Sequence, residues 1–247
     1  MNHLDQIRRE LSPSGVIRVA VNLANTLLVS RVDASGTPVG IVPDIAADVA
    51  SKLSVEVDFV KFAWPAELAE AADQNVWDIC FIAEEPARAT KIAFSCPYAE
   101  IPATYLVRSR APFVTPSDVD QVATRIAVAR GSAYDLWLSR HIQSAKLVRA
   151  ASIEGAVQLF IDENLEALAG LRAHLLLQEI AIPQTRVLAS AFSSVRQAIG
   201  TPPRNTATLS FLNSYARWAV ESGLIQDLIE RHGIRGVELA SPRNEPR

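Results

Sequence analysis

The stretch WDICFIAEEPARATKIAFSCPY, residues 77–98, is the most informative part of this sequence. It begins with an apolar run typical of a buried strand, passes through a polar turn that carries Arg88, and ends in Ala-Phe-Ser-x-Pro-Tyr. A guanidinium offers two parallel donors that match a carboxylate, and here it follows a core strand at an expected crossing between lobes. The stretch therefore favours the capture of a small anionic solute.

The segments on both sides of this stretch alternate between strands and helices. Before it, β-rich runs are separated by helices that open near Pro43 and Pro65, which predicts a mostly parallel sheet covered by helices on both faces. After it, the alternation restarts and ends in two helices. The expected strands are 16–21, 55–60, 76–82, 125–129, 146–148, 165–169, 185–189 and 195–199. The later helices are expected from the turn at 131–132 to residue 142, and over 152–161, 172–180, 206–221 and 224–231.

Two similar α/β halves joined by two extended crossings predict a two-lobed clamshell. The crossings are expected near 104–108 and 194–199, and the C-terminal helices are expected to return to the first lobe. Lobe 1 is therefore expected to be discontinuous, with residues 1–107 and 197–247, and lobe 2 to cover residues 108–196. Each lobe is expected to be a mostly parallel sheet flanked by helices.

The composition argues against several classes of function. The 247 residues are 49% apolar, carry a net charge of −3 and contain no basic block, so neither disorder nor nucleic-acid binding is expected. The four histidines are scattered without Cys/His partners, so no metal site is expected. The sequence lacks a phosphate-binding loop, a dinucleotide fingerprint and a nucleophile elbow, and Cys80 has no nearby histidine. We therefore expect neither a cofactor nor a catalytic residue.

The N-terminal segment, residues 1–15, is polar and shows neither an apolar run nor a small-residue cleavage site, so a signal peptide is not expected. No window approaches the length of a transmembrane helix. We expect a cytoplasmic protein, or a periplasmic one if a leader was removed, and a monomer.

Three blocks of sequence resemble a known family. They are Ile17–Asn22 followed by Gly40–Ala46, then Trp77–Tyr98, then Ile126–Ser132. In these blocks the chain is similar to the family 3 bacterial solute-binding proteins, the ligand-capturing subunits of polar amino acid ABC importers. The resemblance implies a periplasmic-binding-protein type II fold, a small carboxylate-containing ligand held between two lobes, and an ABC importer membrane subunit as partner.

The resemblance also implies roles for single residues. Arg88, six residues before Phe94, stands where the family places the arginine that pairs with the ligand carboxylate. Gly131 and Ser132 stand at the family's second anion contact, although Ser132 equally fits a plain helix N-cap. The other expected ligand-binding positions are Asn22 and Ala83, with Asn25 as a weaker candidate, and the aromatic residues Trp64, Phe81 and Tyr134, for which cleft lining and core packing both stay open.

The chain departs from the family where an α-ammonium group would meet acidic side chains. One acidic position in the first strand is Asn22 here, and a second, in the other lobe, is Leu171. A buried ammonium without a carboxylate partner is poorly compensated, so a carboxylate that lacks an α-amine fits these positions better. Glu84 or Glu85 could restore a cation contact, or could simply be solvated turn residues.

The leading hypothesis is a binding protein without catalytic activity. The family fold also hosts cyclohexadienyl dehydratase, so a small-acid dehydratase is the alternative, with Glu84, Glu85 or Glu166 as the general acid. A cytoplasmic ligand sensor on the same fold is a further alternative.

Overall fold

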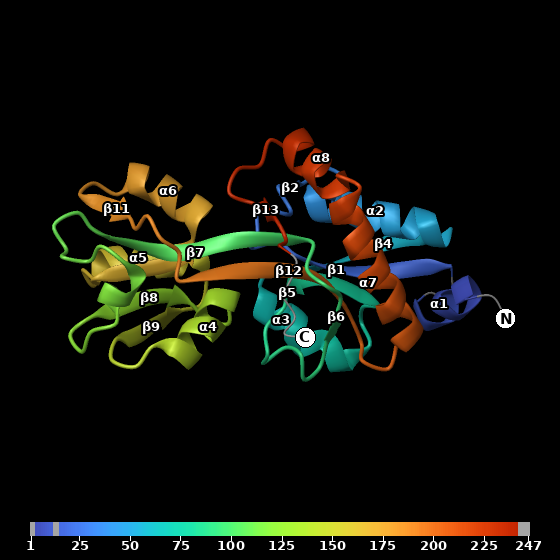
Figure 1. Ribbon diagram of the computed structural model, residues 1–247, viewed down its shortest axis with the longest axis horizontal. Coiled ribbons are helices and arrows are strands. Elements are labelled where there is room, and N and C mark those ends of the chain that lie inside the picture. Colours follow the sequence, from blue (N-terminus) through green and yellow to red (C-terminus); the bar gives the residue numbers. More distant parts are fainter. Residues whose placement is uncertain (1–2, 12–14, 242–247) are drawn as a thin grey trace. The chain divides into compact units, whose positions relative to one another are not determined.

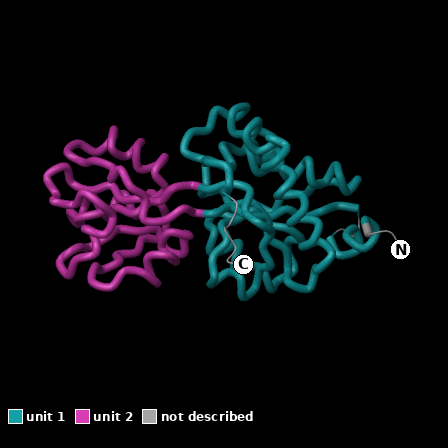
Figure 2. Tube along the Cα trace, viewed as in Figure 1, with its two compact units in different colours: residues 1–100, 196–247 teal, residues 101–195 magenta. Residues whose placement is uncertain are grey.

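The computed structural model describes residues 3–11 and 15–241, which fall into two compact units. Unit 1 comprises Met1–Glu100 and Arg196–Arg247, and unit 2 comprises Ile101–Val195 (Figure 2). The chain passes from one unit to the other twice, within strand β7 (Ala99–Arg108) and within strand β12 (Ser193–Thr201). The predictions made for residues 1–2, 12–14 and 242–247, in the N-terminal segment and at the end of lobe 1, lie outside the described residues.

The sheet of unit 1 has the strand order β4-β1-β5-β12 (Figure 1). Strand β1 (Val16–Asn22) is parallel to both β4 (Glu56–Phe62) and β5 (Ile79–Ala83), and β12 is antiparallel to β5. Each parallel pair is joined through a helix, because a crossover must carry the chain back along the sheet. The helices of this unit are α1 (His3–Leu11), α2 (Ile41–Leu53), α3 (Pro65–Glu70), η1 (Ala71–Gln74), α7 (Thr206–Glu221) and α8 (Leu224–Arg231).

Three short pairings complete unit 1. Strands β2 (Arg31–Val32) and β3 (Pro38–Val39) form a hairpin, and β6 (Ala93–Phe94) pairs with β12. Strand β13 (Glu238–Leu239) pairs with the first residues of β7, so the chain after α8 returns to the sheet. These segments are only two residues long, which is too short for an alternating pattern to be visible in sequence.

The sheet of unit 2 has the strand order β7-β10-β8-β9. Strand β8 (Arg125–Ala129) is parallel to both β9 (Lys146–Ala150) and β10 (Ala167–Leu171), whereas β7 is antiparallel to β10 and to β11 (Thr185–Val187). All five residues of β10 are buried, as expected for a strand covered on both faces. The helices of unit 2 are η2 (Pro116–Val119), α4 (Ala133–His141), α5 (Ile153–Asp162) and α6 (Arg172–Ala181).

The prediction of an α/β fold with mostly parallel sheets flanked by helices is confirmed. The bounds of β8, α7 and α8 match the expected ones, and α7 and α8 belong to unit 1. Helix α1 was not predicted, although Leu4, Ile7 and Leu11 have helical spacing. Ile7 and Leu11 are buried, and the helix packs on α7.

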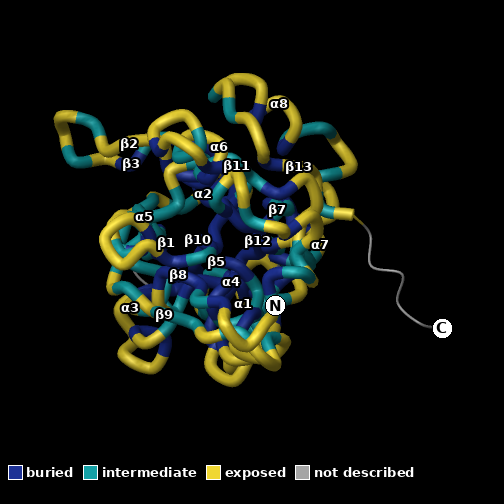
Figure 3. The backbone as a smooth tube through the Cα atoms, turned by 90° about the vertical axis from the view of Figure 1, so that its left-hand side faces the viewer, coloured by how far each residue is buried: buried dark blue, intermediate teal, exposed yellow. Residues whose placement is uncertain are grey.

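The buried residues follow the central strands, and the exposed residues gather on loops and outer helix faces (Figure 3). Cys80 in β5 is buried and Cys96 is half-buried, and both are free thiols. Among the described residues, no helix combines the length and the apolar character that crossing a membrane requires.

Candidate functional site

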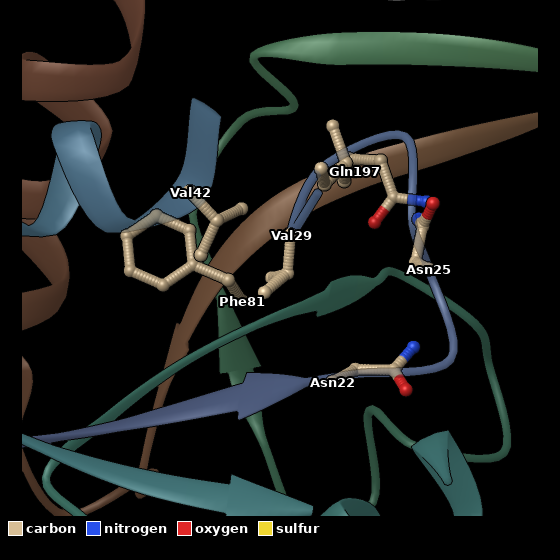
Figure 4. Close-up of a pocket in the computed structure, with 7 residues that line it drawn as sticks. Asn22, Asn25, Val29, Val42, Phe81 and Gln197 are labelled. Atoms are coloured by element: carbon tan, nitrogen blue, oxygen red, sulfur yellow. The ribbon is translucent and has the colours of Figure 1, made fainter. Parts of the chain in front are cut away.

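A pocket lies at the carboxyl edge of the unit 1 sheet, where the parallel strands β1 and β5 end. This edge is where open α/β sheets hold their ligands. The pocket encloses roughly 200 Å³ of empty space, part of it open solvent, and none of its lining side chains is charged. Its lining residues are Asn22, Asn25, Leu28, Val29, Val42, Phe81 and Gln197 (Figure 4).

The loop after β1 is fixed against the start of α2. The Asn25 carbonyl accepts the backbone N–H groups of Leu28 and Val29 at 3.0 and 2.9 Å, and the Leu28 carbonyl accepts the N–H of Val42 at 3.0 Å. Gly40 permits this approach, because a Cβ there, at φ 148°, would lie 3.0 Å from the Cα of Val29. Main-chain hydrogen bonds therefore hold the loop that carries Asn25, Leu28 and Val29 against the start of α2.

Arg88 lies in the turn after β5 and is buried, with 5% of its surface exposed. Its Nη1 donates to the carbonyl of Ala83, the last residue of β5, at 2.8 Å. Burial lowers the pKa of Arg88 to about 10, and the negative charge of Glu85 opposes that shift. The guanidinium thus stays charged at neutral pH in a poorly solvated place, where an anion is attracted more strongly than in water.

Glu84, next to this turn, is engaged in an ion-pair network. Its Oε1 lies 3.0 Å from Nε of Arg196, whose Nη1 lies 3.1 Å from Oε1 of Glu100. Arg196 precedes Gln197, which is the cross-strand partner of Ala83. The Arg88 turn, this network and the pocket therefore share the same pair of neighbouring strands, β5 and β12.

The expected second anion contact lies at the start of α4 in unit 2. The Ser132 hydroxyl accepts the N–H of Asp135 at 3.1 Å, so the N-cap interpretation of Ser132 is confirmed. The side chain of Tyr134 is buried and hydrogen-bonded to Ser132, and burial raises the pKa of Tyr134 to about 12. The N–H of Gly131 donates to the Asp135 carboxylate at 2.9 Å. Ligand contact by these three residues stays a prediction.

Glu166, a candidate general acid, is bound to Arg125. The Oε2 of Glu166 accepts the backbone N–H and the Nε of Arg125 at 2.7 and 3.0 Å, and Oε1 accepts Nη2 at 2.8 Å. These hydrogen bonds from Arg125 hold the pKa of Glu166 below its usual range, which is the wrong direction for a proton donor. Among the described residues, no group of His, Cys, Asp or Glu side chains is arranged to hold a metal ion.

The structure brings some of the expected residues together and leaves others separate. Asn22 and Phe81 line one pocket. Ala83 is on the same strand as Phe81, and its carbonyl accepts a hydrogen bond from Arg88. Trp64 is half-buried at the N-cap position of α3 and is not among the pocket's lining residues. Its role as a cleft wall stays a prediction.

Sequence analysis missed several members of the pocket. Gln197 carries only a partial signal, as a polar residue followed by the apolar Ala198 and Ile199, and the structure leaves it 4% exposed. Val29 and Val42 carry no such signal, since their sequence context fits ordinary packing. They reach the pocket through the backbone bond between Leu28 and Val42.

Comparison with solved structures gives matches over nearly the whole chain. The P235GK mutant of ArgBP from T. maritima has a TM-score of 0.73 at 24% identity, with 95% of this chain and 100% of that chain covered. The ancestral amino acid-binding protein AncCDT-1, a precursor of cyclohexadienyl dehydratase, has a TM-score of 0.74 at 20% identity, with 95% and 100% covered. A histidine kinase sensor domain with similarity to periplasmic binding proteins has a TM-score of 0.77 at 16% identity, with 94% and 100% covered.

At these identities the structural likeness establishes the fold alone. A comparison with curated protein sequences finds no match. A family model, however, matches residues 17–234, which include all of unit 2, most of unit 1 and the pocket. The chain belongs to the bacterial extracellular solute-binding proteins, family 3.

Proposed function

We propose that this protein binds a small carboxylate-containing solute at the carboxyl edge of the unit 1 sheet, with Arg88 as the group that holds the carboxylate. The observation that carries the proposal is the burial of Arg88 in the turn that follows β5. Its surroundings disfavour the positive charge, since burial lowers its pKa to about 10. A bound carboxylate would offset that cost through charge-assisted, bidentate hydrogen bonds.

The anchoring of Arg88 supports this role. Because Nη1 is held by the carbonyl of Ala83 at 2.8 Å, the planar guanidinium is oriented by the end of β5 before any ligand arrives. An oriented donor loses less conformational entropy on binding than a mobile one. The pocket at the carboxyl ends of β1 and β5, which has no charged lining residue, would then receive the remainder of the solute.

We infer a binding role rather than a dehydratase role. A dehydratase needs a general acid that holds its proton near neutral pH. Glu166 has its pKa lowered by Arg125, which is the wrong direction for a proton donor, and the Glu84 side chain is held in an ion pair by Arg196. The proposed partner is the membrane subunit of an ABC importer, as for the amino acid ABC transporter binding protein that shares this fold.

The test is a thermal-shift screen of small carboxylates, in which each acid is matched to its neutral amide or alcohol. A saturating acid at 100 times its Kd stabilises the native state by about 2.7 kcal/mol, which is readily measured. We expect acids alone to raise the Tm, and Arg88→Gln to abolish the shift. Arg88→Lys keeps the charge but not the two parallel donors, so it should restore only part of the affinity.

Arg235→Gln is the matched control, because Arg235 is an exposed arginine of the same unit. It should leave every ligand-induced shift unchanged. Each variant is compared with its own ligand-free Tm, so a general loss of stability in Arg88→Gln is separated from loss of binding. A neutral sugar that stabilises the wild type and Arg88→Gln equally would contradict the proposal.

A further inference from the structure

The pocket at the end of β1 and β5 presents amide groups and no charge. Asn22 lies at the end of β1, Asn25 in the loop that follows, and Gln197 on β12. Figure 4 shows the amides of Asn25 and Gln197 next to each other, and the ring of Phe81 beside Val42. The pocket thus has a polar side made of amides and an apolar side made of aliphatic and aromatic carbon.

Two of these amides differ in their hydrogen bonding. The Oδ1 of Asn22 accepts the N–H of Ala24 at 3.1 Å, and in Figure 4 its nitrogen lies on the side of Asn25. The Oδ1 of Asn25 is buried and has no hydrogen-bond partner among the described residues. A buried acceptor in this state is destabilising until a donor reaches it.

The group that donates a hydrogen bond to Asn25 could be neutral or cationic, and the two differ in the cost of entering this pocket. A hydroxyl or amide N–H that enters pays a modest desolvation cost and satisfies Asn25. An ammonium group pays a much larger desolvation cost, and no lining residue provides a carboxylate to offset it. Neutral donors are therefore favoured over cationic ones at this position.

We propose that this pocket receives an uncharged hydrogen-bond donor of the ligand, a hydroxyl or a primary amide, and discriminates against an ammonium group. The inference rests on the proposed function, in which Arg88 holds the carboxylate of the same ligand. The ligand class is then a small carboxylic acid with a hydroxyl or amide group.

The test compares acids on matched carbon skeletons that carry a hydroxyl, an ammonium or neither group. Suitable triplets are malate, aspartate and succinate; lactate, alanine and propionate; and 3-phenyllactate, phenylalanine and 3-phenylpropionate. Succinamate and butyrate form a matched pair for the primary amide. Kd values are measured by calorimetry at neutral pH. For the carbon skeleton that fits the pocket, the hydroxy or amide acid should bind about tenfold more tightly than the other acids on that skeleton.

Two variants of Asn25 make the test specific. Asn25→Leu has nearly the same shape but no acceptor, so the ratio between hydroxy and unsubstituted acids should fall to within about twofold. Asn25→Asp adds the missing carboxylate, so it should reverse the preference toward the amino acid. The backbone bonds of Asn25 to Leu28 and Val29 use its carbonyl and survive both changes, and the urea midpoint of each variant checks the fold.

The outcomes separate this inference from the proposed function. If amino acids bind the wild type as tightly as the matched hydroxy acids, and Arg88→Gln abolishes both, the inference fails while carboxylate binding stands. If the hydroxy preference survives in Asn25→Leu, the assignment to this pocket is wrong. If no acid binds the wild type, the proposed function fails, and the inference fails with it.

Discussion

The carboxylate of Asp135 accepts the backbone N–H of Gly131 at 2.9 Å, at the start of α4. The same carboxylate accepts a hydrogen bond from Nε of Arg149 at 2.8 Å, and Asp135 is 3% exposed. Helix N-termini attract anions, and this one already holds an anion supplied by the chain itself. A ligand carboxylate at Gly131 would therefore compete with Asp135.

Asp135→Asn is expected to destabilise unit 2. The amide can still accept from Gly131, but it loses the charge that holds Arg149, which remains two-thirds covered. We expect a loss of about 2 kcal/mol in the free energy of unfolding, measured by urea denaturation. Asp162→Asn on the exposed end of α5 is the matched control and should change the free energy by less than about 0.5 kcal/mol. Equal effects of the two changes would refute this account.

Glu10→Ala is expected to weaken the start of α7. The Oε2 of Glu10 accepts the N–H and the hydroxyl of Thr208, both at 2.8 Å, and Oε1 accepts the N–H of Ala207 at 3.3 Å. Loss of this cap should cost about 1–2 kcal/mol of unfolding free energy in a denaturant titration. Glu10→Gln keeps one acceptor oxygen for Thr208 but loses the charge and the acceptor for Ala207, so its cost should be smaller than that of Glu10→Ala. If the two costs are equal, the hydrogen bonds to Thr208 contribute little to the cap.

Gly200→Ala is expected to disturb the core of unit 1. A Cβ on Gly200 would overlap the Cγ2 of Ile92 and lie 2.7 Å from the Sγ of Cys80. Overpacking of this kind typically costs about 1–3 kcal/mol. Ile92→Ala removes the Cγ2 methyl, so in a double-mutant cycle the combined variant should be more stable than the sum of the single changes predicts. Simple additivity would mean that the overlap is relieved by a backbone shift instead.

Glu166→Gln is expected to reduce the loss of stability that the protein shows as the pH falls below about 5. Arg125 holds the pKa of Glu166 below its unfolded value of about 4.3, so this ion pair stabilises the native state above that pH. The contribution is lost as the pH falls through the folded pKa. Thermal melts of the wild type between about pH 5 and pH 3 should therefore drop more steeply than those of Glu166→Gln. Glu70→Gln, on the exposed end of α3, should leave the slope as in the wild type.

Much of the fold was predictable because its signals are local. Helix α7 begins and ends where expected, and Gly223 at φ 85° separates it from α8 by adopting a left-handed conformation. Helix α1 was missed because its polar composition outweighed the spacing of Ile7 and Leu11, and its stability comes from packing on α7. Contacts between distant segments leave no such mark in one sequence.

The candidate site was only partly predictable for the same reason. The position of Arg88 follows from the strand and turn around it, so the sequence points to it directly. Gln197 becomes a site residue only through its register with Ala83, more than a hundred positions earlier in the chain. The hydrogen bond from the Gly131 N–H to the Asp135 carboxylate likewise depends on side-chain geometry, which the spacing of residues in the sequence does not determine.

The cap that Glu10 places on α7 has a practical consequence for truncation. The family match begins at residue 17, so an expression boundary chosen from that alignment would remove α1 together with Glu10. In the shortened protein, the backbone N–H groups at the start of α7 that now bond to Glu10 could be satisfied only by water. The apolar surface against which Ile7 and Leu11 pack would also be exposed. Poor yield or aggregation of such a fragment would then reflect the missing helix rather than an intrinsically unstable domain.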